Sequence, residues 1–269
     1  MKIFQGISIA VGLLFTLSAC ESIEDRAVLK NSFNADEISL SVEQTTPGGN
    51  EVILKMNTPG VAGYWNYLID SKFTNEVKVI LPFIGTTTYT YNVTTPYIEN
   101  GNINTPVYIS KSIDVTINQI DHRLPDAYYN LVGETLAGKT WVFDGVGGDG
   151  RKWWYMTDPG NWNAMWWNAG GECCPPSDAK GKMTFDLNGG ANFTYYASAD
   201  GEAVTGTKWK FNPDFTKLQI VGDAKILGSE GNPGVNKVFE IKELTANHMI
   251  LFVPDAGGTG WVWQFKAAN

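Results

Sequence analysis

The sequence predicts an all-β protein, and three observations support this fold class. Aromatic residues make up 13% of the 269 residues and 29 are glycine, which is typical of short strands joined by tight turns. Apolar and polar residues alternate in short segments, most clearly at 76–81 and 88–93. Turn-forming residues separate these segments at close spacing. We therefore expect two successive antiparallel β domains.

The first residues of the chain are typical of a secretory signal. Lys2 precedes an apolar run at 7–17, which is too short to span a bilayer as a helix. The run ends in Leu-Ser-Ala-Cys, which resembles the lipobox of bacterial lipoproteins and implies cleavage before Cys20 and lipidation of that residue. An ordinary signal peptide with a chance cysteine is the alternative. Residues 1–19 are accordingly assigned to a signal peptide.

The residues after Cys20 read Glu-Ser-Ile-Glu-Asp and carry no strand pattern. We expect residues 20–35 to form a lipidated tether. This acidic start resembles the export signal that directs lipoproteins of Bacteroidetes to the outer face of the outer membrane. The resemblance implies a lipid-anchored protein in the outer membrane that faces the cell exterior.

The charge of the chain excludes two classes of partner. The net charge is −8, and removal of the leader with Lys2 leaves −9, from 19 basic and 28 acidic residues. Nucleic-acid binding requires a basic surface, so it is not expected. Electrostatic adhesion to anionic lipid is disfavoured for the same reason.

Residues 36–120 are expected to form the first domain. The spacing of about seven short strands predicts a small sandwich of immunoglobulin type, with Trp65 in its core. The expected strands are 38–42, 51–56, 63–68, 76–81, 88–93 and 107–117, the last being one long or broken strand.

Two stretches of this domain resemble a PKD domain. Tyr64 and Trp65 lie in a central strand after an Asn-Thr-Pro-Gly turn, and Phe83 and Gly85 lead to a later strand that contains Tyr89. The Gly-Asp-Gly turn that usually follows the Trp strand is replaced by Leu-Ile-Asp-Ser. The resemblance implies a spacer domain.

Residues 121–135 are predicted to be a linker with one or two helical turns near 127–133, and residues 136–269 a second antiparallel domain. Short loops join its strands, so strands that are neighbours in sequence should be neighbours in space. We expect a β-sandwich whose strand order resembles a jelly-roll or a lipocalin-like meander. The expected strands are 181–187, 191–197, 204–211, 216–221, 237–244, 248–253 and 260–265. Alternation assigns Met183, Phe185, Leu187, Trp261, Trp263 and Phe265 to the core and leaves Trp209 open.

Six of the ten tryptophans lie within the 27 residues from Trp141 to Trp167, among Asn, Asp, Arg and Gly. Indoles in so polar a segment suit a surface that stacks on sugar rings. Trp141 and one ring of each Trp pair are expected in the core, and at most three of the other five rings can face one ligand. The predicted stacking residues are Trp153, Trp154, Trp162, Trp166 and Trp167, and the predicted polar edges are Asp149, Arg151, Asp158 and Asn163.

The whole plan is similar to that of surface glycan-binding lipoproteins from polysaccharide-utilisation loci of Bacteroidetes. A lipobox, an acidic start, a PKD-like spacer and a Leu-x-Gly-x-x-Trp domain with Trp-Trp pairs carry the resemblance. It implies a polysaccharide or oligosaccharide ligand and a place beside an outer-membrane transporter. Many of these proteins have His-Phe-Gly where this chain has Gly-Gly-Asp-Gly-Arg-Lys at 147–152, so no ligand residue is transferred.

Cys173 and Cys174 are adjacent, and an oxidising exterior permits a disulfide between them. Such a bridge would be a flat, apolar surface beside the tryptophans. Two unpaired thiols are the alternative. No cofactor is expected, and no zinc site is expected because both histidines lie far away in sequence. Calcium is left as an open question, since Asp144, Asp149 and Asp158 lie in glycine-rich loops.

Three functions are compatible with the sequence, and glycan binding is preferred. A glycoside hydrolase needs a carboxylate pair about 5–9.5 Å apart, and no motif marks one. Surface solvation is the preferred role for the carboxylates near the tryptophans, which are Asp144, Asp149, Asp158, Glu172 and Asp178. A structural lipoprotein that binds a protein partner through its aromatic surface is the third.

Overall fold

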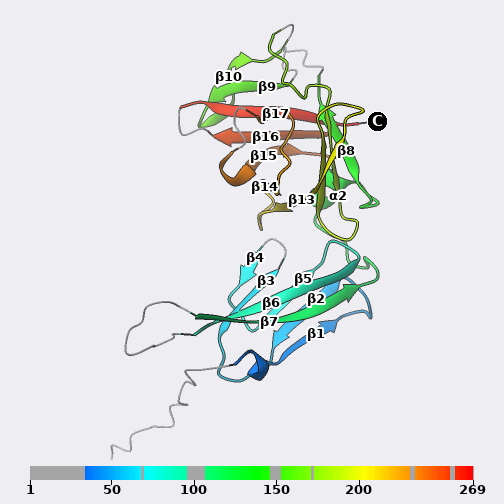
Figure 1. The fold of residues 1–269 in the computed structure, drawn as a ribbon, viewed down its shortest axis with the longest axis vertical. Coiled ribbons are helices and arrows are strands. Elements are labelled where there is room, and N and C mark those ends of the chain that lie inside the picture. Colours follow the sequence, from blue (N-terminus) through cyan, green and yellow to red (C-terminus); the bar gives the residue numbers. More distant parts are fainter. Residues whose placement is uncertain are drawn as a thin grey trace, which may run out of the picture. The chain divides into compact units, whose positions relative to one another are not determined.

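The computed structural model describes residues 34–67, 70–95, 107–145, 153–170, 173–230, 234–254 and 258–268 (Figure 1). Its sheets are antiparallel throughout the described residues, and no helix in this part of the chain is long and apolar enough to cross a membrane. The N-terminal sheets and the C-terminal barrel are described separately below.

The N-terminal part contains seven described strands in two sheets, after a short 3-10 helix, η1 (Ala35–Glu37). The first sheet has the order β1 (Leu40–Gln44), β2 (Glu51–Met56), β5 (Glu76–Ile80). The second has the order β4 (Asp70–Lys72), β3 (Gly63–Tyr67), β6 (Gly85–Thr95), β7 (Val107–Ile117).

Both N-terminal sheets contribute to a single core, because alternate residues of their strands point to the same side. Val52 and Leu54 of β2 and Tyr91 of β6 are fully buried in it. Trp65 is fully buried as well, with its ring centroid 5.2 Å from that of Tyr91, so its prediction as a core residue is confirmed.

Two N-terminal elements differ from the expected strands. The first strand begins at Leu40 rather than at residue 38, because the Ile38 N–H closes η1 by donating to the Ala35 carbonyl. The strand β4 was not predicted, since its three residues, Asp-Ser-Lys, show no apolar alternation. It pairs with β3, with Ser71 opposite Asn66, and so extends the sheet by one strand.

The C-terminal part is an antiparallel barrel with two additional strands. It begins with helix α2 (Asp126–Val132), and the 3-10 helix η2 (Val235–Lys237) precedes β15. The strands are β8 (Lys139–Phe143), β9 (Trp154–Asp158), β10 (Asn161–Asn168), β11 (Lys182–Asp186), β12 (Asn192–Tyr196), β13 (Ala203–Phe211), β14 (Lys217–Val221), β15 (Val238–Leu244), β16 (His248–Pro254) and β17 (Gly260–Ala267).

Eight of these strands form a single closed sheet, the barrel. Each strand from β11 to β17 pairs with the next, and β8 pairs with both β11 and β17. The meander order agrees with the prediction, whereas the expected pair of stacked sheets does not form. Closure between β8 and β17 leaves neither strand with an open edge at the seam, which is the advantage of a barrel over a sandwich.

Side chains fill the inside of the barrel. The fully buried residues include Trp141, Phe185, Phe193, Phe211, Phe239, Trp263 and Phe265. Trp209, whose position the sequence left open, is also buried. Helix α2 joins this core because the Trp141 Nε1–H donates to the Leu131 carbonyl at 2.9 Å.

The loop between β14 and β15 also enters the core. Ile226 and Leu227 are fully buried, and we call residues 224–229 the plug. Buried Asp178 holds the plug by accepting hydrogen bonds from the Gly228 N–H at 3.0 Å and from the Tyr195 hydroxyl at 2.8 Å. Burial, followed by this bond to Asp178, raises the pKa of Tyr195.

The plug requires glycine at position 228. Gly228 has φ +73°, and a Cβ there would lie 2.8 Å from Cζ of Phe143 and 3.3 Å from Cδ1 of Trp263. Gly206 has a similar φ of +77° with nothing within 4 Å, which makes it a matched control. We expect Gly206→Ala to lower the free energy of unfolding by about 1 kcal/mol and Gly228→Ala by about 3 kcal/mol. Urea unfolding measures both, and equal losses would contradict close packing of the plug.

Candidate functional site

The site begins at a fork in strand β17. Residues 265–267 of β17 pair with β8, whereas residues 260–263 pair on the same edge with β9. β9 therefore continues the line of β8 along β17, and β10 adds one more strand outside it (Figure 1). The β9–β10 hairpin in this way extends the sheet beyond the closed barrel.

Four tryptophans form a row on one face of this extension. Trp154 on β9 lies with its ring centroid 4.8 Å from that of Trp167 on β10 and 4.5 Å from that of Trp261 on β17. Trp261 in turn lies 6.5 Å from Trp263, which is fully buried in the barrel core. The cross-strand neighbours explain the row, since Trp261 and Trp167 both lie opposite Met156.

The stacking within this tryptophan row limits which rings can meet a ligand. Trp154 and Trp261 are nearly parallel, at 15°, so each covers one face of the other. Trp261 and Trp263 are also nearly parallel, at 22°, on the inner side. A sugar platform needs an uncovered ring face. Trp154 and Trp261 therefore support the site, and Trp167 on β10 forms the outer end of the row.

The opposite face of the extension has its own small core. Tyr155, Val262, Ile250 and Phe252 are buried there, and Trp162 and Met165 pack over them. Trp162, a predicted stacking residue, is thus on the other side of the sheet from the row.

Trp166 is the exposed ring of the site. Met165 lies opposite Thr157 and Trp167 opposite Met156, so Trp166 is the extra residue of a β-bulge. The bulge leaves this residue without a cross-strand partner, and 57% of the residue is exposed. It is the only exposed tryptophan among the described residues.

The other predicted residues of the site are placed as follows. Trp153, half-buried, packs against the barrel core. Asp158 and Asn163 are exposed at the turn of the β9–β10 hairpin, where the Asn163 N–H donates to Oδ1 of Asn161. Asp149 and Arg151 lie outside the described residues.

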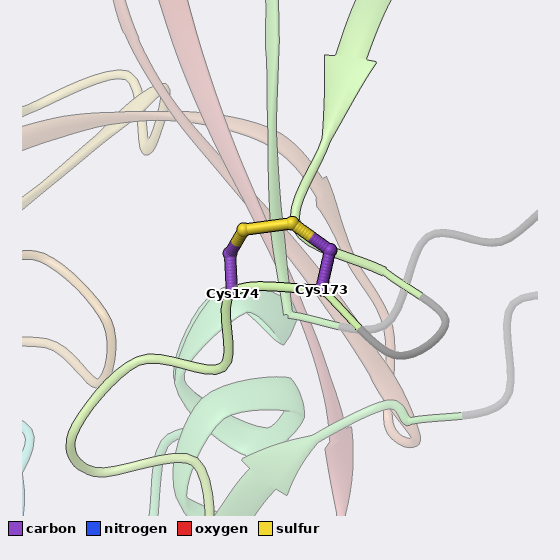
Figure 2. Close-up of a disulfide and its surroundings, with 2 residues drawn as sticks. All are labelled: Cys173 and Cys174. Atoms are coloured by element: carbon purple, nitrogen blue, oxygen red, sulfur yellow. A yellow bond between two sulfur atoms is a disulfide. The ribbon is translucent and has the colours of Figure 1, made fainter.

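Cys173 and Cys174 are joined by a disulfide in the segment between β10 and β11 (Figure 2). The chain is fixed on both sides of this bridge. Upstream, the Ala169 N–H donates to the Trp154 carbonyl at 2.9 Å, and downstream Asp178 binds the plug. The bridge therefore lies in a segment that connects the tryptophan row to the barrel core.

The described carboxylates near the site, Asp144 and Asp158, lie at positions too far apart along the sheet to form a catalytic pair. The Asp144 N–H binds the carbonyl of Gln264, while Asp158 adjoins Thr157, which lies opposite Gly260. Four residues along β17 separate these positions, about 13 Å at ~3.3 Å per residue. Asp178 is buried and accepts hydrogen bonds from Tyr195 and Gly228. Glu172 lies outside the described residues. Within the described part of the chain, no three His, Cys, Asp or Glu side chains are placed to hold a metal ion.

No protein-family model matches the chain, and no curated protein matches its sequence.

Sequence reasoning did not place Trp261 in the site. Alternation assigned it to the core together with Trp263, and both rings do lie on the same side of β17. What alternation could not show is that β17 extends past the closed barrel at this end. There the Trp261 ring stacks on Trp154 of β9.

The row and the bulge should respond differently to truncation. Trp154→Ala removes one of the two middle rings of the row, and we expect it to lower the free energy of unfolding by about 2 kcal/mol. Trp166→Ala removes an exposed ring and should change it by less than about 0.5 kcal/mol. Urea unfolding followed by circular dichroism measures both. A loss at Trp166 as large as that at Trp154 would contradict the assignment of Trp166 as the free ring.

Proposed function

We propose that this chain is a lipid-anchored cell-surface protein that binds polysaccharide or oligosaccharide at the tryptophan site. The observation that carries the proposal is Trp166, an indole that is 57% exposed on a bulge beside the outer end of the tryptophan row. Indoles are enriched at binding surfaces, because the ring combines a large apolar face with a polar N–H group.

The chemistry around Trp166 suits a carbohydrate. An indole face covers the C–H surface of a pyranose ring, and amide side chains bind the hydroxyl groups at its rim. Asn161 and Asn163 are exposed on the same strand, and Asp158 is exposed at the preceding turn. The net charge of −8 favours a neutral glycan over an anionic one.

The N-terminal sheets are consistent with a separate domain that precedes the proposed binding site. Its two sheets, β1-β2-β5 and β4-β3-β6-β7, share one core. We propose that they form an immunoglobulin-type, PKD-like domain. The leader and the lipidated Cys20 lie outside the described residues, so the anchor rests on the lipobox alone.

Glycan binding is tested by affinity electrophoresis of the full chain in gels that contain one polysaccharide each. We expect one neutral glycan to retard the protein, and Trp166→Ala to weaken this binding about tenfold because the free stacking ring is lost. Val221→Ala removes an exposed side chain on β14 and serves as the control. Unretarded migration of the folded protein with every glycan in the panel would refute the proposal.

The anchor is tested by Cys20→Ser in the bacterial membrane. Acyl chains on Cys20 would hold the chain in the membrane, and their loss should move most of the protein to the soluble fraction. Fractionation followed by immunoblotting measures this. Retention of the Cys20→Ser protein in the membrane fraction would show that the lipobox is not the anchor.

A further inference from the structure

The outer face of the β4-β3-β6-β7 sheet has an unusual composition. Tyr89, Tyr91 and Val93 of β6 are buried in the core, so Thr88, Thr90 and Asn92 lie on the opposite side of the sheet. There β6 and β7 meet through short polar side chains. Thr88 donates to Asp114 at 2.6 Å, Thr90 and Ser112 share a hydrogen bond of 3.0 Å, and Ser110 donates to Asn92 at 2.8 Å. We call this surface the hydroxyl face.

An aromatic pair borders the hydroxyl face. Tyr64 of β3 lies directly opposite Asn92, and its ring centroid lies 5.0 Å from that of Phe73, the residue after β4. Phe73 is 79% exposed, which is the largest exposure among the large hydrophobic residues of the described chain. A phenyl ring held against tyrosine but left open to water gives the face a stacking surface.

Asn92 provides an independent sign of a ligand. The residue is only 8% exposed, and its Oδ1 accepts the bond from Ser110. Its Nδ2 is buried and has no hydrogen-bond partner among the described residues. A buried amide donor without an acceptor is unfavourable, because it has lost its bonds to water. The atom has no accessible surface in this structure, so an incoming hydroxyl oxygen satisfies it only after the groups that cover it move aside.

The charge of the face selects the ligand class. Among the residues of its cross-strand pairs only Asp114 is charged, and it already accepts a bond from Thr88. A surface without a described cation in these pairs does not attract phosphate, sulfate or nucleic acid. Hydroxyl and amide groups beside an aromatic pair fit a neutral chain that is itself rich in hydroxyl groups.

We infer that the hydroxyl face is a second carbohydrate-binding site, for a neutral polysaccharide, in which Phe73 and Tyr64 stack on a sugar ring and the Asn92 Nδ2, uncovered as the ligand binds, donates to a sugar oxygen. The inference shares its ligand class with the proposed function and rests on it in that respect. It gives the N-terminal domain a binding role in addition to that of a spacer.

The test uses affinity electrophoresis of the full chain on the same panel of neutral polysaccharides. Phe73→Ala should weaken binding about fivefold to tenfold, as expected for loss of an aromatic anchor. Phe73→Trp should retain binding, because it keeps a stacking ring. Ile80→Ala, which truncates an exposed residue of the other sheet of the same part of the chain, should migrate like the unchanged protein. Circular dichroism checks that each variant is folded.

The outcomes separate the two sites. Weaker binding by Phe73→Ala, together with near-complete loss when it is combined with Trp166→Ala, supports the second site. Phe73→Ala binding like the unchanged protein while Trp166→Ala loses binding overturns the second site and leaves the proposed function standing. Loss in Phe73→Ala with none in Trp166→Ala supports the hydroxyl face and overturns the tryptophan site. No binding of any glycan by the unchanged protein overturns both.

Discussion

The arrangement of the tryptophan site depends on the pairing of strand β17. One edge of β17 pairs along its length with β16, and the other edge is shared between β8 and β9. Backbone hydrogen bonds along a strand must be satisfied wherever water is excluded. Because β8 covers only the end of that edge near Phe265, a second strand is needed near Trp261. β9 meets that need, and it brings Trp154 against Trp261.

The tryptophan row then follows from packing. A fully buried indole, Trp263, fixes the inner end of the row, and each further ring lies against the one before it. Rings used in this way stiffen the hairpin but lose their free faces to one another. The outcome differs for Trp166, which is the extra residue of a β-bulge and is 57% exposed. The number of tryptophans is therefore a poor guide to the size of a binding surface, and the bulge decides which ring remains open.

Local alternation predicted most strands of this chain, and the exceptions have physical reasons. β2 and β7 begin and end where the sequence placed them, since period-two patterns are local. Barrel closure was not predicted, because it rests on pairing between β8 and β17, whose residues are more than a hundred positions apart. Of the site, the sequence identified the aromatic segment but not the partner Trp261, which belongs to a distant strand. The bulge at Trp166 has no signature that alternation detects.

The outer face of the N-terminal sheet β4-β3-β6-β7 differs from the surface that a spacer alone would need. A pure spacer needs a buried core such as that around Trp65, and it gains nothing from an exposed Phe73. Its outer residues would be expected to carry mixed charges, which favour solubility. Here the cross-strand pairs around Thr90 and Asn92 are hydroxyl and amide groups, and one buried amide donor is left unsatisfied. The hydrogen-bonded pairs stabilise the sheet, but the unpartnered Asn92 donor does not, and the exposed Phe73 gains nothing from folding. These last two features are the ones that the proposed ligand would explain.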